Sequence, residues 1–129
     1  MRSVTNRLFV YGSLRRMGGA FERLLSEAAI DVRDGALGDH ALFGWGLPYP
    51  FVRPEPGRRV IGDVVEIHPD RIEDVLRAVD EYEGADYRRV VAEVDADGET
   101  VTAYVYLAER SVELDERNRV ESGDWMMPI

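Results

Sequence analysis

Two β-rich runs on either side of an Asp-Gly pair constrain the fold of this chain more than any other feature of its sequence. Residues 88–94 and 100–107 are rich in β-branched and aromatic side chains, which favour extended backbone. Asp97-Gly98, in the segment between them, is typical of a tight hairpin turn. The pattern predicts two antiparallel strands, and a third run of the same kind, residues 59–67, predicts a central strand.

Helical periodicity occurs in two places. The first apolar stripe, with the spacing of one helix face, consists of Phe21, Leu24, Leu25 and Ala28. A longer helix is predicted after Pro69, with apolar positions from Ile72 to Tyr82 and Gly84 as its C-terminal cap. Residues 8–11 predict a short buried strand, whereas residues 30–52 are glycine-rich and irregular.

Strands outnumber helices in this pattern, and they do not alternate with helices as in a parallel α/β fold. The residues therefore predict an α+β fold with a curved or closed sheet. The length of 129 residues corresponds to one domain of ordinary size, so we expect a single domain over residues 1–129.

Composition excludes several kinds of chemistry. A net charge of -9 repels phosphate backbones, so no nucleic-acid partner is expected. The chain has no cysteine, and all 16 basic residues are arginine, which excludes thiolate nucleophiles, Schiff-base lysines and a P-loop. No apolar run is long enough to span a membrane, and residues 1–7 lack the pattern of a secretion signal. We therefore expect no membrane partner and a cytoplasmic location.

Glu83 is the strongest candidate for a catalytic residue. At about 100° per residue, Glu83 lies on the apolar side of the predicted helix, Glu81 faces water and Asp80 lies at the boundary. A carboxylate that points inward at the end of a helix is desolvated and faces the negative end of the helix dipole, and both effects raise its pKa. Such a group is suited to proton transfer near neutral pH. Alternatively, Glu83 turns to solvent or pairs with Arg88 or Arg89.

A second candidate is the turn after the first predicted strand, Tyr11-Gly12-Ser13-Leu14. Consecutive backbone N–H groups in such a turn bind small anions such as carboxylates, although a turn of this kind is also common as a purely structural feature. Nothing in the sequence places His40 or His68 beside Ser13 for nucleophilic catalysis. No metal-ligand spacing occurs, so no metal site is expected.

Several of these motifs together resemble the gamma-glutamylcyclotransferase-like family, also called the AIG2-like family. The resemblance is carried by residues 8–14, 60–65, 79–84, 87–89, 103–106 and 123–125. It implies a small mixed, largely antiparallel β-barrel with flanking helices and a cavity that holds a gamma-glutamyl group. Tyr11, Gly12, Ser13 and Leu14 match the family's substrate-binding loop, and Glu83 matches its catalytic glutamate. Tyr106, on the strand similar to a Tyr-bearing strand of the family, is a further candidate for substrate binding.

The resemblance implies a metal-independent enzyme of the acyltransferase or lyase type that needs no cofactor. In the implied reaction, the α-amine of a small gamma-glutamyl substrate attacks its own γ-carbonyl, which releases 5-oxoproline and an amine or amino acid. A module that binds a gamma-glutamyl or other small carboxylate ligand without turnover is an alternative, as is hydrolysis or acyl transfer to an external amine. We expect residues 38–53, including Trp45 and the prolines beside Tyr49, to determine which leaving group is accepted. Neither the leaving group nor the oligomeric state follows from the sequence.

Overall fold

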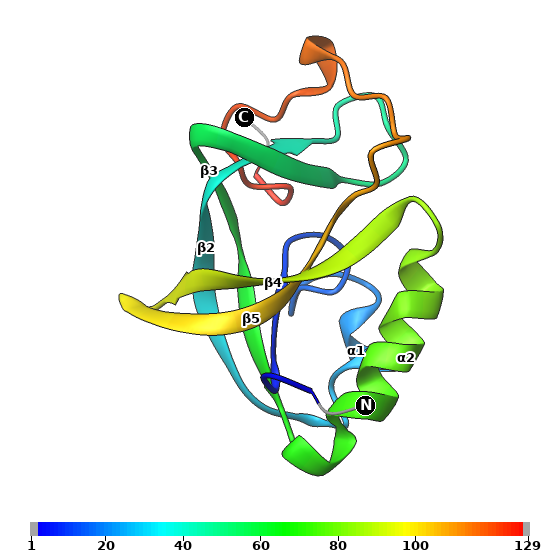
Figure 1. Ribbon diagram of the computed structural model, residues 1–129, viewed down its shortest axis with the longest axis vertical. Coiled ribbons are helices and arrows are strands. Elements are labelled where there is room, and N and C mark those ends of the chain that lie inside the picture. Colours follow the sequence, from blue (N-terminus) through cyan, green and yellow to red (C-terminus); the bar gives the residue numbers. More distant parts are fainter. Residues whose placement is uncertain (1–2, 128–129) are drawn as a thin grey trace.

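Five strands form a closed barrel in the computed structural model, which describes residues 3–127 (Figure 1). Around the barrel their order is β1-β3-β2-β4-β5. The strands are β1 (Arg7–Val10), β2 (Ala29–Phe43), β3 (Phe51–Ile67), β4 (Tyr87–Ala96) and β5 (Glu99–Ala108). Neighbouring strands are antiparallel except β1 and β5, which run parallel and meet at Leu8 and Tyr104. The predicted α+β class and the mixed, largely antiparallel barrel are confirmed. Residues 1–2 and 128–129 of the expected domain lie outside the described residues, as does the part of the signal-sequence expectation that rests on residues 1–2.

The predicted hairpin is formed by β4 and β5. Their register runs from Tyr87 opposite Ala108 to Ala96 opposite Glu99. The two turn residues have positive φ angles, 50° at Asp97 and 86° at Gly98. Positive φ at both positions is the requirement of a type I′ turn, which explains why Asp-Gly stands there.

The prediction that residues 30–52 are irregular is wrong, because most of them belong to β2 and β3. The glycines that suggested a loop instead permit close packing inside the barrel. Gly35 on β2 lies opposite Gly62 on β3. A Cβ atom on Gly35 would lie 2.6 Å from Val64, and one on Gly62 would lie 2.3 Å from the carbonyl oxygen of Val10.

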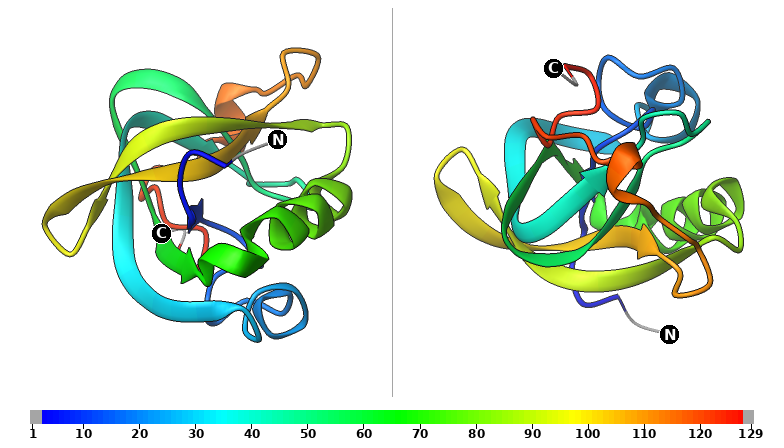
Figure 2. Two further views of the ribbon diagram at one scale, coloured as in Figure 1. Left: turned by 60° about the horizontal axis from the view of Figure 1, so that its bottom comes forward. Right: turned by 90° about the horizontal axis from the view of Figure 1, so that it is seen from above.

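The longer predicted helix is confirmed as α2 (Ile72–Glu83), which lies beside the barrel (Figure 2). A short 3-10 turn, Pro69–Arg71, precedes it, and it ends at Gly84, whose φ of 79° suits a glycine. The first helix, α1 (Phe21–Leu24), is shorter than its apolar stripe predicted. The chain turns after Leu24 because it must enter β2 at Ala29, although Leu25 and Ala28 are buried as the stripe indicates.

The alternating side chains of β1 enter two different parts of the core. Leu8 and Val10 pack with α1 and α2, whereas Phe9 and Tyr11 face the barrel interior, as the period of two in a strand requires. The residues that follow β1 therefore emerge where the helix layer and the barrel meet.

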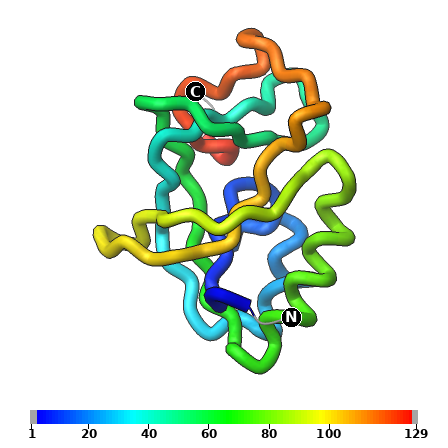
Figure 3. Tube along the Cα trace, viewed as in Figure 1, coloured from blue at the N-terminus to red at the C-terminus, as the bar shows by residue number. Residues whose placement is uncertain are grey.

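The C-terminal segment folds back onto the barrel. It includes a 3-10 turn, Glu116–Asn118. Val120 donates its N–H to Leu42, and Ile61 donates its N–H to Gly123. The Trp125 ring packs against Gly44, in the space that a Cβ atom on this residue would fill. In Figure 3 this segment lies at the upper end of the molecule, next to the extended part of β2 and β3. Among residues 3–127, no helix is both long and apolar enough to cross a lipid bilayer.

We predict that Gly62→Ala destabilises the fold by about 1–3 kcal/mol, the usual cost of overpacking. Its new methyl group would overlap Val10 and the Phe9 ring, 2.8 Å away. Gly38→Ala is the matched control, because no atom lies within 4 Å of the added Cβ. Thermal unfolding of both variants checks this, and equal melting temperatures contradict it.

Candidate active site

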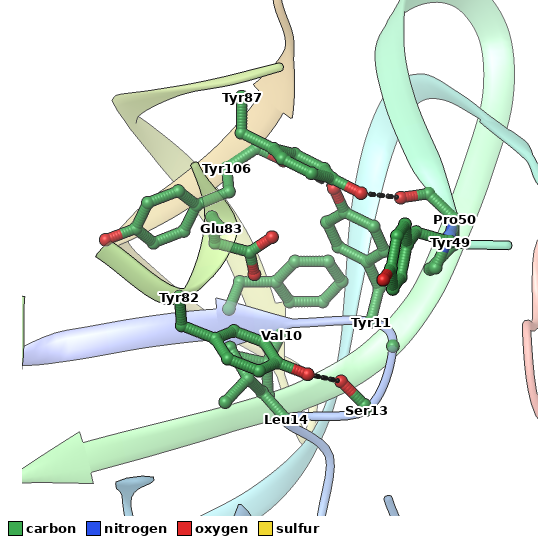
Figure 4. Close-up of a pocket in the computed structure, with 12 residues that line it drawn as sticks. Val10, Tyr11, Ser13, Leu14, Tyr49, Pro50, Tyr82, Glu83, Tyr87 and Tyr106 are labelled. Atoms are coloured by element: carbon green, nitrogen blue, oxygen red, sulfur yellow. Dashed lines mark hydrogen bonds between the residues drawn. The ribbon is translucent and has the colours of Figure 1, made fainter. Parts of the chain in front are cut away.

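A cavity of about 310 Å³ opens between the end of β1, the loop that joins β2 to β3, and the last turn of α2 (Figure 4). Its walls are largely aromatic. The lining residues are Phe9, Val10, Tyr11, Gly12, Ser13, Leu14, Tyr49, Pro50, Tyr82, Glu83, Tyr87 and Tyr106. All six residues predicted as a site from the sequence are in this set, so the structure brings them together.

Glu83 points into the cavity from the last turn of α2 (Figure 4). Its side chain is partly buried, whereas Glu81, two residues earlier, is exposed. The difference follows from the helix rotation, because Val75, Leu76 and Val79 press the apolar face of α2 against the barrel and Glu83 continues that face.

Asp80 holds this end of α2 against the hairpin of β4 and β5. The Tyr106 hydroxyl donates to one carboxylate oxygen of Asp80 at 2.5 Å, and the Arg89 guanidinium donates to the other at 2.7 Å. Arg88 lies 4.0 Å from Glu109. In the part of the chain that the structure describes, Glu83 forms no ion pair with either arginine, so the alternative that it is neutralised there is wrong.

Burial raises the pKa of Glu83 from 4.5 to about 7. The direction agrees with the sequence-based prediction, and its physical cause is the aromatic wall, which removes water without supplying a compensating charge. The same burial raises the pKa of the Tyr11 and Tyr87 phenols further from neutrality, and the nearby Glu83 adds to this effect. The cavity thus holds one group that can take up or release a proton near neutral pH.

The 11–14 loop (Tyr11, Gly12, Ser13 and Leu14) forms the opposite wall. Gly12 is necessary there because a Cβ would lie 2.8 Å from the Pro50 ring. The backbone N–H groups of Gly12, Ser13 and Leu14 have no acceptor among residues 3–127. Three free amide groups beside a cavity can bind an anion, as the sequence suggested.

One hydrogen bond crosses the rim of the cavity between the two walls. The hydroxyl groups of Ser13 and Tyr82 lie 2.7 Å apart, and Figure 4 shows this bond below the Glu83 carboxylate. Tyr82 is 39% exposed, and the Arg23 guanidinium lies 5.6 Å from its ring centre. No histidine lines the cavity.

Two tyrosines of the predicted site line the cavity with their rings and use their hydroxyl groups elsewhere. Tyr11 donates to the carbonyl oxygen of Tyr106 at 2.5 Å, and the Tyr106 hydroxyl turns away to Asp80 (Figure 4). The structure thus connects the 11–14 loop to α2 through Tyr106.

Six further lining residues were not predicted as site residues. They are Phe9, Val10, Tyr49, Pro50, Tyr82 and Tyr87. Tyr87 donates to the carbonyl oxygen of Pro50 at 2.7 Å and stacks on Phe51 with ring centres 4.8 Å apart. Tyr87 belongs to the motif that carries the family resemblance, and Tyr49 lies in the segment expected to determine specificity. The places of Tyr87 in this motif and of Tyr49 in this segment are the sequence signals that could have identified them as site residues. Trp45 from the same segment does not line the cavity.

No metal-binding group is apparent in the described residues. Within residues 3–127, no three side chains of the His, Cys, Asp or Glu type gather as metal ligands would.

The chain matches the sequence model of the family described as "Gamma-glutamyl cyclotransferase, AIG2-like" over residues 8–127. The match includes every residue of the cavity wall and confirms the resemblance found in the sequence. None of the curated proteins matches the chain.

Several solved structures share the fold. An AIG2-like protein from Mus musculus is similar with a TM-score of 0.69 and 22% identity, over 95% of this chain and 92% of that one. An uncharacterized protein from Pyrococcus horikoshii gives a TM-score of 0.65 and 19% identity, over 92% and 88%. A structure named gamma-glutamyl cyclotransferase gives 0.63 and 20%, over 81% and 67%.

We predict that Glu83 makes the protein less stable as the pH rises. Because its folded-state pKa of about 7 lies above the reference value of 4.5, its stabilising contribution is complete below pH 4.5 and is lost as the pH rises through about 7. The shift corresponds to about 3 kcal/mol. Glu83→Gln should lack this loss, and the exposed Glu81→Gln should retain it. Denaturant unfolding at pH 5 and pH 8 measures the difference, and parallel pH profiles for wild type and Glu83→Gln contradict the prediction.

Proposed function

The chain belongs to the AIG2-like gamma-glutamyl cyclotransferase family, and we propose that it is an enzyme that converts a gamma-glutamyl compound into 5-oxoproline and a free amine or amino acid. Glu83 is its general base and acid, and the 11–14 loop binds the carboxylate of the substrate. The single observation that carries the proposal is the Glu83 carboxyl group in the cavity, with a pKa of about 7 and no ion-pair partner among the described residues.

The reaction needs two protons to move from the attacking to the leaving nitrogen. The Glu83 carboxylate accepts a proton from the α-ammonium group of the substrate, and the free amine attacks the γ-carbonyl carbon. A C–N bond forms, and the carbonyl electron pair moves onto oxygen. When the carbonyl re-forms, the amide C–N bond breaks and Glu83 protonates the leaving nitrogen. The second proton follows from the ring nitrogen to the released amine, so Glu83 ends as a carboxylate.

The cavity wall contributes by holding the substrate in a folded conformation. An intramolecular attack gains most of its rate from a bound geometry that brings the two reacting atoms together. The rings of Tyr11, Tyr87 and Tyr106 form a rigid wall, because their hydroxyl groups are all engaged in hydrogen bonds to other parts of the chain. The free N–H groups of the 11–14 loop fix the other end of the substrate.

The proposed steps draw on acid-base and hydrogen-bonding groups that this chain supplies, and we propose that neither a metal nor a cofactor takes part. The alternative of a binding module has the same cavity and the same loop. The raised pKa of Glu83 favours an enzyme, because a pure carboxylate-binding site gains nothing from a nearby acid that ionises at neutral pH. Hydrolysis or acyl transfer to an external amine would use the same base and differs in its product.

We predict that Glu83→Gln abolishes 5-oxoproline release, because the amide cannot accept the ammonium proton. Glu81→Gln is the matched control from the same helix, exposed and outside the cavity, and it should retain activity. A panel of gamma-glutamyl amines and amino acids, with products identified by mass spectrometry, measures this.

Three other outcomes separate the alternatives. Full activity of Glu83→Gln refutes its role as the base. A rise in melting temperature with no product from any compound indicates a binding module. Glutamate or a new gamma-glutamyl amide in place of 5-oxoproline indicates hydrolysis or acyl transfer.

The pH dependence gives a separate prediction. Because Glu83 must be ionised to accept a proton, kcat/KM should fall as the pH drops below about 7. Initial rates from pH 5 to pH 9 with one substrate of the panel measure the profile. A profile that is flat down to pH 5 contradicts proton transfer to this group.

A further inference from the structure

Asp63 is the one buried carboxylate of the described residues. It lies on β3 opposite Val10, the last residue of β1, and is only 2% exposed. It does not line the cavity, so the proposed reaction does not use it directly. A buried carboxylate is costly unless charged groups and hydrogen bonds compensate it, and the partners of Asp63 therefore indicate what its burial achieves.

The partners come from the residues that directly follow the 11–14 loop. One carboxylate oxygen of Asp63 accepts the backbone N–H of Arg16 at 2.9 Å. The other accepts from the Arg16 guanidinium at 3.0 Å and lies 3.7 Å from the guanidinium of Arg15. Arg16 also reaches Asp34 on β2, and Arg15 reaches Asp124 in the C-terminal segment. These five residues, Arg15, Arg16, Asp34, Asp63 and Asp124, form the Asp63 cluster.

The side chains of the 11–14 loop are attached to the rest of the fold by the burial of Tyr11 and Leu14, the Tyr11–Tyr106 hydrogen bond and the Ser13–Tyr82 hydrogen bond, whereas its backbone has few such attachments. Its hydrogen bonds to residues 15–20 are internal to the segment, such as those from Arg15 to Gly12 and from Ala20 to Ser13. The N–H groups of Gly12, Ser13 and Leu14 have no acceptor among residues 3–127. Within residues 12–18, the N–H of Arg16 is the one backbone donor that bonds a side chain from another element.

We propose that Asp63 is a positioning residue that holds the 11–14 loop in the conformation that binds the substrate carboxylate. This inference rests on the proposed function of the loop. Free amide groups bind an anion strongly only when they are already oriented toward it, because otherwise the binding energy must also order the loop. Asp63 fixes the loop through Arg16 and leaves the N–H groups of residues 12–14 unoccupied.

The charges of the cluster explain why the anchor is ionic. A loop that binds an anion cannot be fixed through the same N–H groups, so its attachment must use other groups. Two consecutive arginines, each bonded to two carboxylates, tie the loop to β2, β3 and the C-terminal segment at once.

The test compares Asp63→Asn with Glu55→Gln. Glu55 makes bonds of similar kind to the buried Arg119, but it lies outside the cavity wall. In Asp63→Asn we expect hydrogen exchange of the hydrogen-bonded amides of Arg15, Gly18 and Ala20, whose acceptors lie within residues 12–15, to accelerate about tenfold relative to the amides of α2. Glu55→Gln should leave this ratio unchanged.

Kinetics supply the second readout. With a substrate from the panel, KM of Asp63→Asn should rise about tenfold while kcat changes less than threefold, because ground-state carboxylate binding is weakened and proton transfer is not. Its pH profile should match that of the wild type. Equal KM values and equal exchange of the Arg15, Gly18 and Ala20 amides in Asp63→Asn and wild type overturn the proposal, as does a loss confined to kcat.

A third variant keeps the test decisive if Asp63→Asn does not fold. Arg16→Gln removes the guanidinium but retains the backbone N–H, and its side chain is 40% exposed, so the fold should tolerate it. Arg58→Gln is its control, because the Arg58 side chain is 43% exposed and pairs with Glu55 and Glu121, outside both the cluster and the cavity wall; it should change neither exchange nor KM. The same exchange and KM changes are expected in Arg16→Gln, and their absence overturns the proposal.

The two proposals fail in different ways. If the wild type yields no 5-oxoproline from any compound, the proposed function fails while the exchange experiment still decides whether Asp63 orders the loop. If the wild type is active and exchange and KM are unaffected by Asp63→Asn and Arg16→Gln, only the role of Asp63 fails.

Discussion

The hydrogen bonds that Asp80 accepts from Tyr106 and Arg89 fix the end of α2 on the barrel, and the geometry of the site depends on this attachment. Asp80 lies one turn before Glu83, so it determines the direction in which the glutamate side chain leaves the helix. Tyr106 also accepts a hydrogen bond from Tyr11 through its carbonyl oxygen. One residue of β5 thus connects both walls of the cavity, and movement of either wall requires a change at Tyr106.

The parts of the fold that could be predicted from the sequence are those determined by local interactions. The β4–β5 hairpin follows from the positive φ angles that Asp97 and Gly98 tolerate. The end of α2 follows from Gly84, and the direction of Glu83 follows from the periodicity of the helix. Each of these depends on residues within one or two turns of the chain.

The parts that could not be predicted depend on contacts between distant segments. The glycine-rich sequence of β2 resembles a loop, because the partners of Gly35, which are Val64 and Phe9, are invisible in the local pattern. For the same reason, only some of the tyrosines that line the cavity could be predicted from the sequence. A tyrosine on a strand shows which face it belongs to, but the direction of the Tyr106 hydroxyl depends on Asp80, 26 positions away in the sequence.

The barrel closes through a parallel pairing of β1 and β5 in which Leu8 meets Tyr104. One wall of the cavity is therefore made at the start of synthesis and the other near its end, with the intervening strands required to bring them together. Contacts at such a separation are entropically costly to close and tend to form late. A nascent chain on the ribosome has no cavity until β5 has emerged. The Glu83 carboxyl group therefore becomes buried only after the barrel has closed.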